Sequence, residues 1–248
     1  MGTLPRAGYH STMPFRLRLS RIARFAIALA GITLLALAAH DSALRGLADW
    51  RSTRGRHDIR MWTQGRAVQS EEQWQRAVDA LREALRLAPQ DPALWESLGF
   101  AYDIGSRNFV PNGGRGGWSV YSEFALIHFR QAAALRPTSP YSWAGVAVMK
   151  YRLDQLDEEF RQAFSSAMRL GPWEPGLQLI TSDMGLALWD RLDSQLRDEV
   201  RENWRRTAVR QADQLAKLAI SRGRAGVVCE EAVEEALDAL KNRLKCPK

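Results

Sequence analysis

Two pairs of neighbouring acids have the residue types and spacing for general acid/base chemistry, in which one carboxyl group donates a proton and another accepts one. The pairs are Asp190 with Asp193 and Glu158 with Glu159. Both fall near the ends of expected helices, where acids also interact favourably with the helix dipole. We therefore interpret them as helix-end and surface charges, and we do not expect an enzyme.

Histidines and a glycine-rich stretch offer no other route to catalysis. No spacing of His, Cys or carboxylates matches a metal site, and the four histidines are isolated: His10, His40, His57 and His128. The sequence GGRGG at 113–117 resembles a phosphate-binding loop, but it lacks the Gly-Lys-Ser/Thr ending and a preceding strand. We expect a flexible loop there, with no metal and no cofactor.

The net charge of +7 raises the question of nucleic-acid binding. Part of this charge lies in the N-terminal leader. A second cluster lies on expected helices, among acids: Arg201, Arg205, Arg206, Arg210, Lys217, Arg222 and Arg224. We interpret it as a solvated helix face, with an acidic polymer or anionic head group as the alternative ligand. No nucleic-acid partner is expected.

Two of the nine tryptophans are candidates for binding a ligand or a partner. Trp118 falls in an inserted stretch and Trp173 in a turn, so neither is needed to fill a helical core. Five other tryptophans occur at helical spacing and are expected to pack in the core: Trp74, Trp95, Trp143, Trp189 and Trp204.

The two cysteines, Cys229 and Cys246, leave two alternatives open. The residues between them, EEAVEEALDALKNRLK, suit one amphipathic helix with its acids first and its bases last. A straight helix would hold the cysteines about 24 Å apart, beyond the roughly 7 Å limit for a disulfide. Either the helix is broken and the cysteines pair, or the thiols are free.

The elements that carry these residues follow a repeated helical pattern. Within WQRAVDALREALRLAPQDPALWESLGFAY (74–102), large, small and helix-terminating residues recur at fixed spacing: Trp74, Ala77, Leu81, Ala84, Pro89, Trp95, Leu98, Gly99, Ala101 and Tyr102. This stretch resembles the tetratricopeptide (TPR) repeat, a 34-residue helical hairpin. Small residues let helices approach, aromatic residues fill the space between them, and the proline stops the helix.

The same register recurs twice. Ala132, Leu135, Pro137, Pro140 and Trp143 match the first set, and Ala167, Leu170 and Pro172 match again. Pro137 to Pro172 spans 35 residues, whereas Pro89 to Pro137 spans 48, so one repeat carries about 14 extra residues, within 105–122. Val146, Ala147 and Lys150 depart from the TPR pattern. The resemblance implies an all-α fold, a TPR-like solenoid of helical hairpins.

The N-terminus predicts the compartment. Arg16, Arg18, Arg21 and Arg24 precede a run of fifteen uncharged residues, 25–39. That run spans about 22 Å as a helix, short of the roughly 30 Å hydrocarbon core unless flanking residues join it. An uncleaved anchor is the favoured interpretation; a signal peptide cut after Ala38, or a buried cytosolic helix, are the alternatives.

The arginine bias places the leader inside, so we expect a single-pass inner-membrane protein with its C-terminal domain in the periplasm. Translation begins at Met1 or Met13. The expected segments are a basic cytoplasmic leader (1–23), a transmembrane anchor or signal peptide (24–40), a juxtamembrane helix or linker (41–69), TPR-like repeats (70–228) and a C-terminal helix (229–248).

The TPR resemblance also implies a partner-binding groove lined by the first helix of each pair. The residues at its positions are Glu96, Phe100, Asp103, Tyr141, Ala144, Val148, Tyr151 and Arg152. Such a mixture of aromatic and charged groups suits an extended peptide or a helix. Beside it we expect a projecting loop and a turn, with Asn112, Arg115, Trp118 and Trp173 as candidates.

A narrower resemblance suggests the process. The segments LRPTSPYSW and LGPWEP, followed by DMGLALWDRL and the late Cys229, are similar to the VpsP-type family of polysaccharide biosynthesis proteins over roughly residues 70–230. That family implies a membrane-anchored scaffold that binds protein partners in exopolysaccharide synthesis or export. The alternative is direct binding of glycan, or its processing by the Asp pairs.

Overall fold

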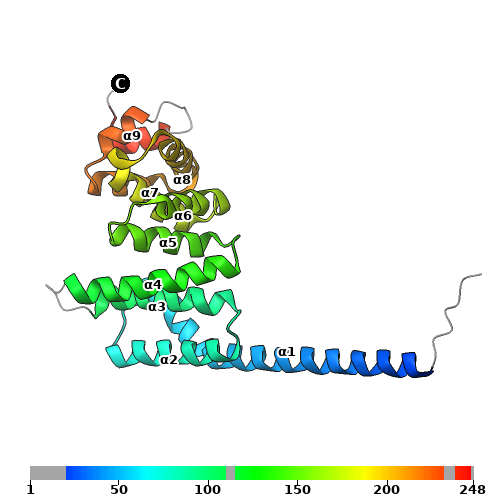
Figure 1. Ribbon diagram of the computed structural model, residues 1–248. Coiled ribbons are helices and arrows are strands. Elements are labelled where there is room, and N and C mark those ends of the chain that lie inside the picture. The colour runs from blue at the N-terminus through cyan, green and yellow to red at the C-terminus, as the bar shows by residue number, and fades with distance from the viewer. Residues whose placement is uncertain (1–20, 110–114, 232–237, 247–248) are drawn as a thin grey trace, which may run out of the picture. The chain divides into compact units, whose positions relative to one another are not determined.

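The computed structural model describes residues 21–109, 115–231 and 238–246, and every regular element within these ranges is a helix (Figure 1). The elements are α1 (Arg21–Thr63), α2 (Glu71–Leu87), α3 (Pro92–Asn108), α4 (Arg115–Leu135), α5 (Pro140–Arg152), α6 (Glu158–Leu170), α7 (Pro175–Leu188), the 3₁₀ turn η1 (Trp189–Arg191), α8 (Ser194–Ser221), α9 (Ala225–Glu231) and α10 (Asp238–Leu244). The expectation of an all-helical chain with one long apolar N-terminal helix is confirmed.

α1 is long and apolar enough to cross a membrane, by length and composition. Its apolar side chains before residue 40 are exposed, as Phe25 and Leu35 show at 75% and 72% of their surface. The chain divides into two compact units, Met1–Leu44 and Arg45–Lys248. The helix continues past residue 40, the expected end of the anchor, into the expected juxtamembrane segment, and no proline interrupts the hydrogen bonds of α1 before Thr63.

The second unit begins with the last part of α1 packed on α2. A stripe with helical spacing is buried there: Ala48, Ser52, Gly55, Ile59 and Trp62. Glycine is needed at position 55, because a Cβ would lie 2.9 Å from the carbonyl oxygen of Ala77. Arg51 and Glu83 approach to 3.8 Å beside this contact.

The helices from α3 to α8 pack in successive pairs, α3 with α4, α5 with α6, and α7 with α8, and α9 and α10 pack on α8. Figure 1 shows the helices following one another in chain order. The first helices of successive pairs also touch, α3 with α5 and α5 with α7. One continuous apolar core runs through these helices.

Three turns between helices repeat the same hydrogen bond at the register that the sequence predicts. A side-chain N–H donates to the carbonyl of a proline six residues earlier: Trp95 Nε1 to Pro89 (2.8 Å), Trp143 Nε1 to Pro137 (2.7 Å) and Gln178 Nε2 to Pro172 (2.8 Å). Each turn ends in an N-cap residue followed by a proline in the first helical turn: Asp91–Pro92, Ser139–Pro140 and Glu174–Pro175. The equivalent sequences therefore build equivalent turns.

The side chain of Phe129, on α4, fills the space between α3, α4 and α5. It is 1% exposed, and its ring meets Phe100 edge-on with centroids 5.0 Å apart. The ring also lies against two glycines, Gly99 of α3 and Gly145 of α5, where any Cβ would come closer than the 3.0 Å that real Cβ contacts keep. Both glycines are thus required by close packing.

The flexible loop expected at 113–117, within the insertion at 105–122, is wrong from residue 115 onward. α3 continues to Asn108 and α4 already begins at Arg115, so the insertion mainly lengthens these two helices. Trp74 explains this extension: the rings of Phe109 and Tyr121 lie 5.6 and 5.3 Å from it. Its Nε1 also donates to the carbonyl of Ala101 (2.7 Å). Burial of aromatic surface outweighs the low helix propensity of the glycines.

The C-terminus is not the single helix expected over 229–248. It contains α9 and α10 as separate elements, and a disulfide joins Cys229 to Cys246 with their Cα atoms 5.5 Å apart. A straight helix cannot bring residues 17 positions apart to that distance. The amphipathic pattern arises because each short helix buries one apolar side, with Val228 and Leu240 in the core.

Candidate functional site

Most polar residues of the expected groove, on α3 and α5, bond to other helices. Glu96 of α3 accepts hydrogen bonds from Ser139 Oγ (2.9 Å) and Ser142 Oγ (2.5 Å), and Arg136 lies 3.4 Å away. Only 16% of its side chain is exposed. Glu96 therefore ties α3 to the beginning of α5.

Asp103 forms a second tie between the same helices. Its carboxylate pairs with Arg152 of α5 and, at 2.9 Å, with Arg107 of its own helix. Asp103 is 13% exposed at its side chain. One buried carboxylate thus holds two guanidinium groups, which leaves a net positive charge beside it.

α5 is tied to α7, and α7 to the end of α8, in a similar way. Tyr141 donates to Glu174 (2.6 Å), and this hydrogen bond raises the pKa of Tyr141 to about 12. Arg222, which follows α8, makes a two-pronged ion pair with Asp183 of α7 (2.7 and 2.6 Å). Among the polar groove candidates the structure joins Asp103 to Arg152 directly, whereas Glu96 and Tyr141 have separate partners near the ends of neighbouring helices.

The three apolar groove candidates pack inward: Phe100 lies on Phe129, Ala144 is 4% exposed, and Val148 packs against the core. Of the expected groove residues, Tyr141 remains 41% exposed. On α7, Ile180 is 44% exposed, but in the register that the Gln178 hydrogen bond shares with Trp95 and Trp143 it aligns with Ser97 and Gly145 and not with an expected groove position.

Of the four candidates in the insertion and the turn, the structure describes the side chain of Trp173 only. Asn112 lies outside the described residues, and Arg115 and Trp118 lie in α4 with side chains outside the described part. Trp173 is 62% exposed, and the Arg206 guanidinium lies over its ring, 5.9 Å from the centroid. Trp173 is therefore an aromatic surface held in place by a cation–π contact.

Ion pairs occupy much of the basic cluster on α8. Arg201 bonds to Glu231 (2.6 Å), Arg222 to Asp183 and Arg224 to Asp190 (2.5 Å). Glu202 pairs with both Arg205 and Arg206. These contacts agree with a helix face whose charge is largely neutralised.

The two acid pairs also have structural partners. Asp193 caps α8 by accepting from Leu196 N (2.9 Å), and Asp190 pairs with Arg224. Glu158 lies 3.2 Å from Arg161. The two carboxylate oxygens of Glu159 accept hydrogen bonds from Nε and Nη2 of Arg130, at 2.6 and 2.5 Å.

Lys150, which stands seven residues after Trp143 as Tyr102 stands seven after Trp95, is the most deeply buried cation of this network. Its side chain is 2% exposed, and Nζ donates to Asp157 and Glu159, each at 2.6 Å. Burial acts to lower the pKa of Lys150, but these two hydrogen bonds outweigh it and raise the pKa. The Lys150 bond lowers the pKa of Asp157, and Arg130 lowers that of Glu159.

No His, Cys or carboxylate cluster that could hold a metal ion occurs in the part of the chain that the structure describes. His10 lies outside that part. His128 lies between Trp95 and Tyr102, with ring centroids 5.6 and 5.1 Å away. Burial lowers its pKa, and its Nδ1 is 2.6 Å from the carbonyl of Phe124, so packing accounts for it.

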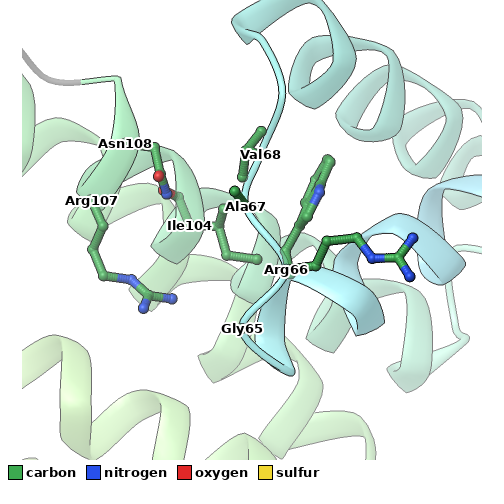
Figure 2. A pocket seen from close by; sticks show the side chains of 8 residues that line it. Gly65, Arg66, Ala67, Val68, Ile104, Arg107 and Asn108 are labelled. Atoms are coloured by element: carbon green, nitrogen blue, oxygen red, sulfur yellow. The ribbon is translucent and has the colours of Figure 1, made fainter.

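A pocket of about 220 Å³ lies between the end of α1 and the end of α3 (Figure 2). Its walls are Trp62 and the connection Gly65, Arg66, Ala67 and Val68 on one side, and Ile104, Arg107 and Asn108 on the other. This volume accommodates one or two residues of a ligand and is smaller than a typical drug-sized site. No motif in the sequence indicates this pocket, because its two walls are about 40 residues apart.

No family model matches the chain, and no curated protein is significantly similar to it.

Proposed function

We propose that the protein is a non-catalytic, membrane-anchored TPR-like scaffold whose helical domain binds protein partners outside the cytoplasmic membrane. The observation that carries the proposal is the hydrogen bond repeated at three turns, by Trp95, Trp143 and Gln178. Equivalent turns joining antiparallel helix pairs are what a helical-repeat solenoid requires. Such a fold supplies an extended surface for partners.

The proposed location is the inner membrane, with the second unit in the periplasm. Support comes from the length and composition of α1 and from the arginines that precede its apolar part. The disulfide between Cys229 and Cys246 supports an oxidising compartment, because disulfides persist mainly outside the reducing cytosol.

The proposed process is exopolysaccharide synthesis or export. Its support is the resemblance of LRPTSPYSW and LGPWEP to the VpsP-type family. In the structure these segments form two of the three equivalent turns and carry Tyr141, Trp143 and Trp173. They therefore occupy the edge at which successive helix pairs meet.

A second candidate function, glycan binding, is favoured by one observation. Trp173 presents 62% of its surface to solvent beside Arg206, and an exposed ring with a neighbouring hydrogen-bond donor suits a sugar.

The two functions are separated by purifying the tagged full-length chain from membranes of its source organism. Recovery of synthesis or export proteins, unchanged in Trp173→Ala, supports the scaffold. Saturable retention on the cell's own polysaccharide that is lost in Trp173→Ala, without such proteins, contradicts it. Trp50→Ala is the matched control, because Trp50 is also exposed (75%) but lies on α1.

A further inference from the structure

The pocket at the ends of α1 and α3 is rich in hydrogen-bond donors and contains no acid. Arg66 has no side-chain partner among the described residues, and its guanidinium is exposed. Arg107 uses only part of its guanidinium on Asp103, at 2.9 Å. The charge that faces a ligand is therefore positive on both sides, because Asp103 already serves Arg107 and Arg152.

An indole N–H and two backbone N–H groups add to these cations. Trp62 is 7% exposed, and its indole N–H donates to no acceptor in the described part of the chain. The backbone N–H groups of Ala67 and Val68 likewise have no acceptor there. A group rich in hydrogen-bond acceptors would satisfy donors that otherwise need water.

The arrangement of the walls restricts the shape of the ligand. Figure 2 shows Arg66 and Arg107 extending to opposite sides, with Ile104, Ala67 and Val68 between them. The arginines do not converge on one point, so a single small anion cannot engage both. A chain with acids on either side of an apolar residue matches two separated cations and an aliphatic floor.

We propose that this pocket binds an acidic, extended segment of a protein partner. A peptide is favoured over an acidic sugar, because the aliphatic floor would leave the hydroxyls of a sugar ring without hydrogen-bond partners. An apolar peptide side chain gains from the same floor. The proposal rests on the scaffold function and names the class of partner segment that one of its surfaces recognises.

The test uses the full-length chain in non-ionic detergent and a fluorescein-labelled peptide, acetyl-Glu-Glu-Leu-Glu-Glu-amide, followed by fluorescence anisotropy. We expect saturable binding that weakens about tenfold in Arg66→Gln, the loss typical of one charge-assisted hydrogen bond. Ala67→Glu places a carboxylate in the pocket at an exposed position and weakens binding at least as much. The control Arg169→Gln removes one exposed positive charge from α6 and leaves the affinity within twofold.

Equal loss in Arg169→Gln, equal binding of the Gln-substituted peptide, or no saturation overturns the proposal. Stronger binding of trigalacturonate than of the peptide overturns the peptide assignment in favour of an acidic sugar. Circular dichroism of each variant establishes that it is folded. Failure of peptide binding is distinguishable from failure of the scaffold function, because crosslinking of a partner to a residue of α7 does not depend on Arg66.

Discussion

Replacing Gly145 by alanine is expected to destabilise the protein, although alanine is the better helix former. The added Cβ would overlap the ring of Phe129. The ring cannot move away from α5, because its other side is already in close contact with Gly99 of α3. Overpacking a core costs about 1–3 kcal/mol, whereas Gly to Ala in a helix gains up to about 1 kcal/mol. With Phe129 confined on both sides, we expect a net loss of about 2 kcal/mol.

Thermal unfolding followed by circular dichroism measures this loss as a fall in Tm of about 4–8 °C for a chain of this size. Gly176→Ala in α7 is the matched control, because no atom lies within 4 Å of its added Cβ, and its Tm should be unchanged or higher. Phe129→Leu shortens the confined ring. If the cost of Gly145→Ala is the same in the Phe129→Leu background as in the parent, the packing explanation is wrong.

Three further predictions concern the ion-pair network, the disulfide and one tyrosine. Lys150→Ala should lower the free energy of unfolding, measured in urea, by about 2 kcal/mol, which is less than for a fully buried ion pair because Asp157 is 56% exposed. Lys150→Met should lower it by under about 1 kcal/mol. Equal losses in the two variants would contradict a role that depends on the charge. Serine at both Cys229 and Cys246 should lower stability by about 3 kcal/mol, and a thermal scan with an unchanged Tm would refute this. The pKa of Tyr141 in the folded protein is raised to about 12, so the stability that this tyrosine contributes is complete below pH 10 and is lost as pH rises from 10 to 12. Tyr141→Phe should therefore remove the loss of stability between pH 10 and 12. An unaltered dependence of stability on pH in this range would contradict the hydrogen bond to Glu174.

The helical fold and the turn register follow from local sequence. Prolines, N-cap residues and the tryptophans at 95 and 143 act within six residues of their partners, so their spacing predicts the turns. The third turn was recognisable only in part, because Gln178 supplies the same hydrogen bond without the tryptophan.

The features that sequence analysis missed or misjudged depend on contacts between distant residues. Glycines suggested a loop at 113–117, but Trp74 packs on both flanks of that stretch and stabilises helix. Amphipathic spacing suggested one C-terminal helix, whereas the Cys229–Cys246 bond requires two. The braces made by Glu96 and Asp103 join residues more than 40 positions apart, so no spacing rule could have assigned their partners.

The most direct test of the scaffold function is photocrosslinking in living cells of the source organism. A photoreactive phenylalanine analogue at Ile180, which is 44% exposed on α7, the first helix of its pair, is compared with one at Val209, which is 69% exposed on α8. The scaffold function predicts a discrete adduct from position 180 that contains a protein of polysaccharide synthesis or export, with little from position 209. Adducts to polysaccharide alone, or identical adduct patterns from both positions, would contradict it.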